Sequence, residues 1–245
     1  MDMILEVLHG KAIPSHKNHA YHQKSECLFM KKFILVFLFL LINLSIAAAP
    51  TDLNFNDVKA NSTKHPLVKG KFKIIQLSDA NNALKIYSTD KSDSGKVQIP
   101  LNLAKASDSK FKLSCDVKVS TTATPAGKLL AISNWDTNDE LFRIQLGAGK
   151  LQLKATKYQN GRLVASNICT YKSNNWMTIE LIVNNNNGNC KVSIIDKATK
   201  ISLYKSTHTI NKKFKGVYLT SSVWPGQSKD GYSYEFDNIK VTPLK

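Results

Sequence analysis

The stretch Lys110–Ser120, KFKLSCDVKVS, decides the fold class. Its odd-numbered residues are apolar and its even-numbered residues are polar or charged, without an exception. Because successive side chains of a strand point to opposite faces, this period of two is typical of a strand with one buried face. The stretch therefore predicts a β-strand that lies between a core and a polar surface.

Short apolar runs of the same kind recur on both sides of this stretch, separated by clusters of Asn, Asp, Gly, Ser and Pro. After residue 50 no apolar pattern has the spacing and length of a helix. We predict further strands at 72–77, 84–88, 96–101, 128–133, 140–147, 150–157, 162–170, 176–184, 190–196, 199–205, 214–221 and 232–242. So many short strands at regular spacing predict an all-β sandwich or barrel.

Two turns are explicit in the sequence. Asn160-Gly161 supplies two residues that tolerate positive φ, as a tight hairpin between 151–158 and 162–170 requires. The polar run Asn184–Asn189 predicts a second turn between the strands at 176–184 and 190–196.

The beginning of the chain has the features of an export signal. Lys31 and Lys32 precede the apolar run 33–46, and Ala47, Ala48 and Ala49 follow it. A positive start, a short apolar run and a small-residue exit predict a cleaved signal peptide at 30–49 and a secreted protein. Two interpretations of residues 1–29 stay open: an upstream extension that is not translated, or a cytoplasmic tail before an uncleaved membrane anchor.

Residues 50–70 are polar and irregular and predict a linker or a loosely held first strand, so that the β-sandwich domain covers 71–245. The chain carries a net charge of +16, most of which lies after residue 49. A basic secreted domain attracts anionic partners, of which an anionic polysaccharide or glycan is favoured and nucleic acid is not expected. The alternative is a solvated basic exterior, because the lysines are scattered and form no long run.

Cysteines and one sequon are the candidates for modification. Cys169 and Cys190 fall in strand-like segments on either side of the Trp176 strand, and export permits a disulfide between them. Cys115 lies on the apolar side of its strand and is predicted to be buried and free. Asn61-Ser62-Thr63 is a glycosylation acceptor in a polar segment, relevant if the source is a eukaryote.

Three groups of segments resemble the concanavalin A-like (laminin G-like) jelly rolls over roughly residues 71–245. Asn81–Ile86, Lys96–Leu101 and Phe111–Val119 resemble their opening, and Asn175–Leu181 with Cys190–Asp196 resembles their central hairpin. Gly216–Leu219 and Phe236–Val241 resemble their terminal strands. The resemblance implies a two-sheet antiparallel jelly-roll sandwich. Lectins, carbohydrate-binding modules, glycoside hydrolases, polysaccharide lyases and adhesion domains share this fold.

No catalytic set is predicted. Hydrolases of this fold carry three acidic residues on one face of a single strand, whereas Glu140, Glu180 and Glu235 lie far apart in this sequence. Lyases of this fold use a glutamine–histidine pair, which is missing here. If the protein cleaves its ligand, we expect the catalytic groups among Asp136, Glu140, Arg143 and Tyr218.

A binding module needs an aromatic platform and a few polar groups beside it. Trp176 opens the strand at 176–184, and its place in the alternation predicts that it lies in the core. Trp224 lies in the loop-like segment Ser221–Gln227 and is the first candidate for stacking on a sugar, with Trp135 as the second. Arg143 and Gln145 share one side of a strand and could bind hydroxyl or carboxylate groups. Two further aromatic residues that could extend this face are Tyr158 and Tyr232.

The resemblance also implies a structural calcium ion at Asp237, since several members of the fold bind calcium through an aspartate of the last strand. The alternative is that Asp237 bonds a neighbouring backbone amide. The leading hypothesis is a secreted, lectin-like module that recognises a polysaccharide, an acidic one in view of the charge. The alternatives are a polysaccharide-degrading lyase or hydrolase of the same fold and a protein-binding adhesion domain.

Overall fold

The structure, a computed structural model, describes residues 51–88, 94–103, 110–120, 127–133, 139–147, 152–160, 162–211, 218–223 and 233–244. Its regular elements within these ranges are β-strands. Within the same ranges no helix is long and apolar enough to cross a membrane.

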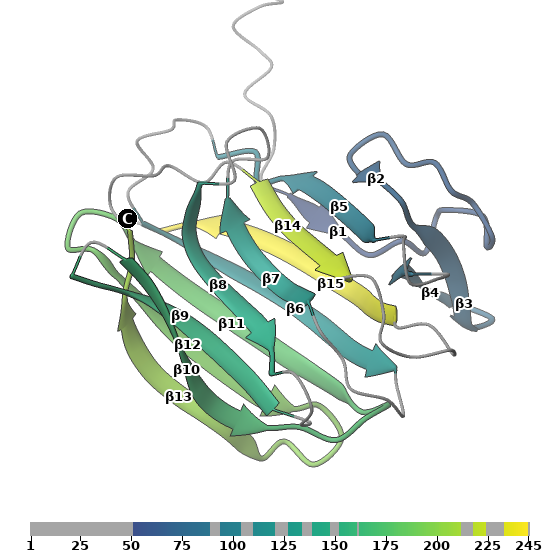
Figure 1. Cartoon of the computed structure of the whole chain (residues 1–245). Helices are drawn as coiled ribbons and strands as arrows, with labels where there is room; N and C mark the ends of the chain where they lie inside the picture. The colour runs from purple at the N-terminus through teal and green to yellow at the C-terminus, as the bar shows by residue number, and fades with distance from the viewer. Residues whose placement is uncertain are drawn as a thin grey trace, which may run out of the picture. The chain divides into compact units, whose positions relative to one another are not determined.

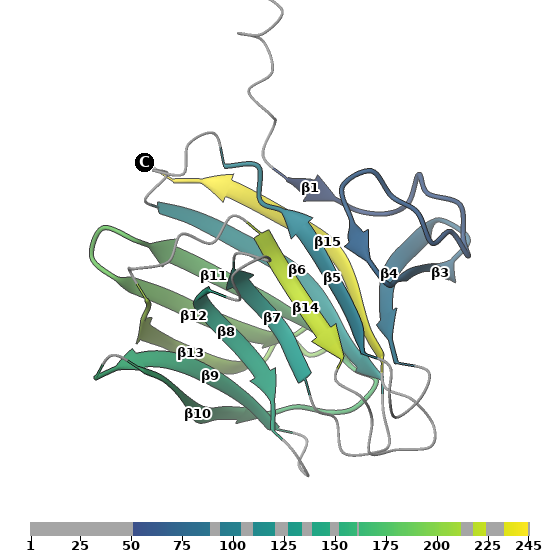
Figure 2. The same cartoon turned by 45° about the horizontal axis from the view of Figure 1, so that its top comes forward.

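The strands form two antiparallel sheets, which Figures 1 and 2 show as two layers. We call the eight-stranded layer the back sheet, and its strand order is β13-β12-β11-β6-β15-β4-β3 with β1 paired to β15. Its strands are β1 (Asp52–Leu53), β3 (Lys73–Ser78), β4 (Asn81–Tyr87), β6 (Lys110–Ser120), β11 (Trp176–Asn184), β12 (Asn189–Asp196), β13 (Ser202–Thr209) and β15 (Ser233–Pro243).

We call the seven-stranded layer the front sheet, and its order is β10-β9-β8-β7-β14-β5-β2. Its strands are β2 (Lys69–Gly70), β5 (Gly95–Pro100), β7 (Gly127–Ser133), β8 (Glu140–Leu146), β9 (Gln152–Gln159), β10 (Arg162–Thr170) and β14 (Tyr218–Val223). The all-β, two-sheet antiparallel prediction is confirmed.

The core lies between the sheets and follows from the alternation of each strand. In β6 the apolar residues, Phe111 to Val119, are buried, and Leu113 stands opposite Leu181 of β11. Phe142 of β8 and Ile132 of β7 face the same interior from the front sheet, each fully buried. Truncation of such a buried leucine or phenylalanine to alanine costs about 2–5 kcal/mol.

The segment expected to be a linker or a first strand enters both sheets. β1 pairs with β15 of the back sheet, and β2 pairs with β5 of the front sheet. Phe55 and Val68 from the same segment are buried in the core. At Gly70 the backbone has a φ of 117°, and a Cβ there would lie 2.0 Å from the carbonyl oxygen of Lys96. Only glycine permits this approach of β2 to β5.

The Asn160-Gly161 hairpin is confirmed, since Gln159 pairs with Arg162 and Asn160 has a φ of 48°. The strand predicted at 199–205 begins later in the structure, where β13 runs over Ser202–Thr209. The Asp196 carboxylate accepts hydrogen bonds from the amides of Ala198 and Thr199, which extends the turn after β12.

The predicted disulfide is not present, because Cys169 and Cys190 are both free. Cys190 is buried on the core side of β12 in the back sheet, whereas Cys169 is half-buried in β10 of the front sheet. Proximity to the Trp176 strand in sequence therefore does not place the two cysteines in one sheet. Cys115 is buried and free, as predicted.

Candidate functional site

The front sheet has a polar outer side, which we call the front face. It is unusual because six of its polar side chains are buried although they point away from the core. The alternation of the strands and their register place these residues there: Gln98, Ser133, Glu140, Thr156, Thr220 and Ser222. Buried polar groups cost free energy unless they are paired, so the contacts of this face decide what it can do.

A β-bulge places Lys128 on the front face. Leu130 pairs with Ile144 and Lys128 pairs with Gln145, so that Leu129 is the extra residue of the bulge. Without the bulge, strict alternation would point Lys128 into the core together with Leu130. The Ser221 hydroxyl donates a hydrogen bond to the Lys128 carbonyl at 3.1 Å and so satisfies the backbone beside the bulge.

A second bulge places Glu140 beside it. Phe142 pairs with Ile132, whereas Glu140 pairs with Ser133, so that Leu141 is the extra residue. Glu140 would otherwise share the buried side of Phe142. Two bulges in adjacent strands thus bring one cationic and one anionic side chain to the same outer face, and bulges often redirect side chains in this way at functional sites.

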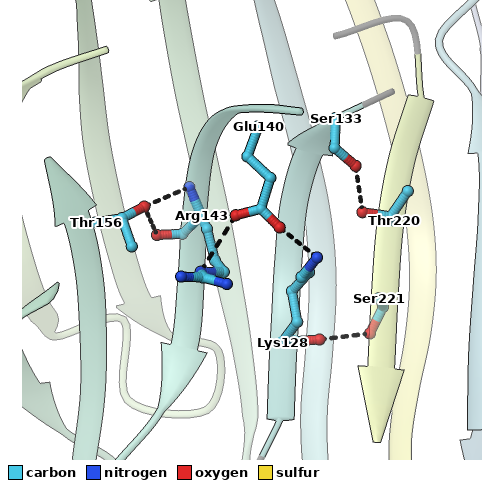
Figure 3. A network of polar contacts seen from close by, with 7 residues as sticks. All are labelled: Lys128, Ser133, Glu140, Arg143, Thr156, Thr220 and Ser221. Atoms are coloured by element: carbon cyan, nitrogen blue, oxygen red, sulfur yellow. Dashed lines mark hydrogen bonds and ion pairs between the residues drawn. The ribbon is translucent and has the colours of Figure 1, made fainter. Parts of the chain in front are cut away.

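Glu140 connects two cations, as Figure 3 shows. One carboxylate oxygen forms an ion pair with the Lys128 ammonium, and the other lies 3.3 Å from Nε of Arg143. The side chains of Glu140, Lys128 and Arg143 are 5%, 13% and 23% exposed, in that order. The contact between Glu140 Oε2 and Arg143 Nε is electrostatic, because neither buried atom has an aligned hydrogen-bond partner among the described residues.

Hydroxyl groups hold the strands around this ion-pair cluster. Thr156 Oγ1 accepts a hydrogen bond from the Arg143 amide at 3.0 Å and donates one to the Arg143 carbonyl at 3.1 Å. Ser133 and Thr220 share a hydrogen bond of 2.7 Å between their hydroxyls. Arg143 therefore projects from a fixed backbone (Figure 3). The buried polar side chains of the front face form its floor, in which Ser133 and Thr220 bond to each other.

The half-exposed residues stand on this floor. Arg143 and Gln145 share the front face, as predicted, and Lys154 of β9 pairs directly with Gln145. Tyr218 and Glu140 both pair with Ser133, from opposite sides. Together these side chains offer a guanidinium, an amide, an ammonium and a phenol to a ligand.

The aromatic candidates are not placed by the structure. Trp135, Trp224 and Tyr232 lie outside the described residues, as does Asp136, and so does the side chain of Tyr158.

The proposed calcium ligand Asp237 lies on the outer side of the back sheet, which we call the back face. Its Oδ1 accepts a hydrogen bond from the Asn238 amide at 2.8 Å. A bond to a neighbouring backbone amide is the alternative to calcium binding that the sequence left open for Asp237. Burial raises the pKa of Asp237, and the Asn238 amide offsets part of this rise. Among the described residues no group of three His, Cys, Asp or Glu side chains could hold a metal ion. A calcium ion completed by backbone oxygens stays a prediction.

Its neighbour Asp116 has protein partners for both carboxylate oxygens. Thr178 Oγ1 donates to Oδ1 at 2.6 Å, and Lys197 Nζ lies 2.5 Å from Oδ2. Lys197 and Lys118 also lie over the ring of Trp176, at 5.9 Å and 5.3 Å from its centroid. The sequence predicted Trp176 in the core, but β11 directs it to the back face and buries Met177 instead.

Sequence reasoning missed Lys128 and did not assign Glu140 to a binding face. A signal for both is present in the sequence. In Lys128-Leu129-Leu130 and in Glu140-Leu141-Phe142 a charged residue is followed by two adjacent apolar residues, which breaks the alternation. Such a break between alternating stretches predicts a bulge.

No protein-family model and no curated protein matches the sequence. Solved structures do match. A sialidase aligns with a TM-score of 0.56 at 12% identity, over 80% of this chain and 19% of that chain. The winged bean acidic lectin, in complex with methyl-α-D-galactose, aligns with a TM-score of 0.51 at 9% identity, over 76% of this chain and 98% of the lectin.

The two-sheet topology and the lectin alignment agree with the resemblance seen in the sequence. The fold is a concanavalin A-like jelly roll. A structure of botulinum neurotoxin type C, described by its interaction with two ganglioside molecules, aligns with this jelly roll as well. Its TM-score is 0.53 at 14% identity, over 82% of this chain and 50% of the toxin chain. The jelly roll thus spans only part of the sialidase and toxin chains, and at these identities the likeness concerns the fold.

Proposed function

We propose that this protein is a secreted, lectin-like module that binds a polysaccharide on its front face. The observation that carries the proposal is the layered polar surface of the front sheet. Half-exposed Arg143, Gln145 and Lys154 stand on a floor of buried polar side chains. In this floor Ser133 bonds to Thr220, and Thr156 bonds to the backbone of Arg143. The winged bean lectin among the structural neighbours, which is in complex with methyl-α-D-galactose, supports a sugar-binding role for this fold.

The floor gives the face the properties of a binding site. A sugar presents many hydroxyl groups, which require convergent donors and acceptors that are fixed before binding. Strand-borne groups are more precisely held than loop-borne ones, and here Thr156 fixes both backbone groups of Arg143. Less side-chain entropy is then lost on binding.

Trp224 and Trp135 stay the candidates for stacking on a sugar ring, with Tyr158 and Tyr232 as further contacts. The support for these four aromatic residues is their place in the sequence.

The proposal includes secretion, which is supported by the signal-like segment at residues 30–49 of the sequence. Asn61 is exposed in the structure, so that a glycan could be attached there during export from a eukaryotic cell.

Electrophoresis of the purified protein through gels that contain single polysaccharides tests the proposal. New reducing or unsaturated ends are measured in the same mixtures. We expect retardation by at least one polysaccharide and no new ends. New ends would favour the enzyme alternative and direct attention to Asp136, Glu140, Arg143 and Tyr218. The absence of both retardation and new ends would contradict glycan binding and favour a protein partner.

A pair of glutamine variants locates the site. Gln145→Ala removes a half-exposed amide from the front face, and Gln76→Ala removes an exposed amide from β3 of the back sheet. We expect Gln145→Ala to weaken retardation and Gln76→Ala to leave it unchanged. Equal effects would contradict the assignment to the front face.

A further inference from the structure

The strands of the front sheet are almost free of acidic residues. Of all residues in its seven strands, which the structure describes, Glu140 is the one carboxylate. The cations that these strands place on the front face are Lys69, Lys96, Lys128, Arg143 and Lys154. The front face therefore has a local excess of positive charge.

The back face differs, because its carboxylates are distributed among its lysines. Four ion pairs lie on this side: Lys112–Glu180, Lys118–Glu235, Lys197–Asp116 and Lys240–Asp52. An anionic ligand on the back face would compete with carboxylates that already neutralise these lysines. Other lysines of the back face, Lys73, Lys85, Lys191 and Lys205, carry positive charge as well. The two faces thus differ in the number of carboxylates that their strands place among the cations, and not in the presence of positive charge.

Arg143 is the cation of the front face that is best prepared for a ligand. Its backbone is held by Thr156 through two hydrogen bonds. Glu140 approaches its Nε from one side at 3.3 Å without an aligned hydrogen bond. A guanidinium carries five N–H donors in a planar fork that suits carboxylate and sulfate oxygens. Glu140 therefore orients Arg143 and leaves donors of the guanidinium for a ligand.

Lys154 is close enough to act with Arg143. It pairs with Gln145, which lies two residues from Arg143 on the same side of β8. Residues diagonal to each other on one face have Cα atoms about 7–8 Å apart, a distance that long side chains easily bridge. One acidic group could contact both cations, and Gln145 between them could bond a neighbouring hydroxyl.

We infer that the front face binds an acidic polysaccharide, with Arg143 as the anchor for its carboxylate or sulfate groups and Lys154 as the second cation. This inference rests on the proposed function and specifies its ligand class. Glu140 is a positioning residue for Arg143 in this site.

The test uses affinity electrophoresis of the purified protein in gels with polygalacturonate, dextran sulfate or neutral galactomannan. We expect retardation by an acidic polymer that exceeds retardation by galactomannan at least tenfold. The first two gels distinguish carboxylate from sulfate. Binding to galactomannan alone would overturn the inference and leave the proposed function standing, whereas absence of retardation in every gel would contradict both.

Variants that each lose one positive charge then distinguish binding at a defined site from general electrostatic attraction to the basic protein. Arg143→Ala and Lys112→Ala each remove one positive charge, the first from the front face and the second from the back face. We expect Arg143→Ala to weaken binding of the acidic polymer at least tenfold and Lys112→Ala to change it less than twofold. Arg143→Lys keeps the charge and loses the fork, so that partial rescue is expected. Equal losses in the two alanine variants, both with native melting temperatures, would overturn the inference.

Discussion

Replacement of Glu140 by glutamine removes the negative charge that faces both Lys128 and Arg143 while it preserves the shape of the side chain. Glu140 is 5% exposed and Lys128 is 13% exposed, so that water screens their attraction poorly. Removal of one partner from a buried ion pair costs about 3–5 kcal/mol. Arg143 is 23% exposed and can be partly solvated, which places our expectation near the lower limit, at about 3 kcal/mol.

The assay is urea unfolding of the protein and the variant, followed by thermal melting. A loss of about 3 kcal/mol corresponds to a melting temperature lower by about 6–12 °C for a domain of this size. Glu180→Gln is the control, since Glu180 and Lys112 are 31% and 36% exposed and such a pair contributes at most about 1 kcal/mol. If Glu140→Gln destabilises the protein no more than Glu180→Gln, the cluster does not hold the front face together.

Four further results are expected. Hydrogen bonds to Lys197, Thr178 and Asn238 lower the pKa of Asp116 against the opposing effect of burial, which is the largest single contribution. The stability that ionised Asp116 provides is therefore present above the unfolded pKa of about 3.9 and lost as the pH falls through its folded pKa. The difference in unfolding free energy between the protein and the Asp116→Asn variant should therefore disappear in acid. Thiol titration of the denatured protein without reductant should detect Cys115, Cys169 and Cys190 as free thiols. If two of these cysteines do not react, they form a disulfide. If Asp237 binds calcium, EDTA lowers the melting temperature, and an unchanged value rejects the calcium prediction. Trp224→Ala should weaken polysaccharide binding with folding intact, and unchanged binding rejects stacking on this side chain.

The fold was predictable because it follows from local alternation. The pattern of Lys110–Ser120 depends on the side chains of one strand and predicts which of them are buried. The prediction that the alternation places Trp176 in the core was wrong, because the buried residues of its strand begin at Met177. Trp176 therefore points outward, and two lysines lie over its ring.

The candidate site was only partly predictable because it depends on bulges and on strands that are distant in sequence. Arg143 and Gln145 follow from the alternation of one strand. Lys128 and Glu140 do not, since one extra residue in each strand reverses the side to which they point. The placement of β14 between β5 and β7 joins segments about a hundred residues apart, and no local pattern encodes such a neighbour.

A polysaccharide site on the front face is tested most directly by mapping the amide chemical shifts of the isotope-labelled protein during titration with a polysaccharide that retards it. We expect the shifts to concentrate at Arg143, Gln145, Lys154 and Tyr218 on the front sheet, while Thr178 and Glu180 of the back sheet stay unchanged. Shifts that concentrate on the back sheet, or that spread evenly over both, would contradict a polysaccharide site on the front face.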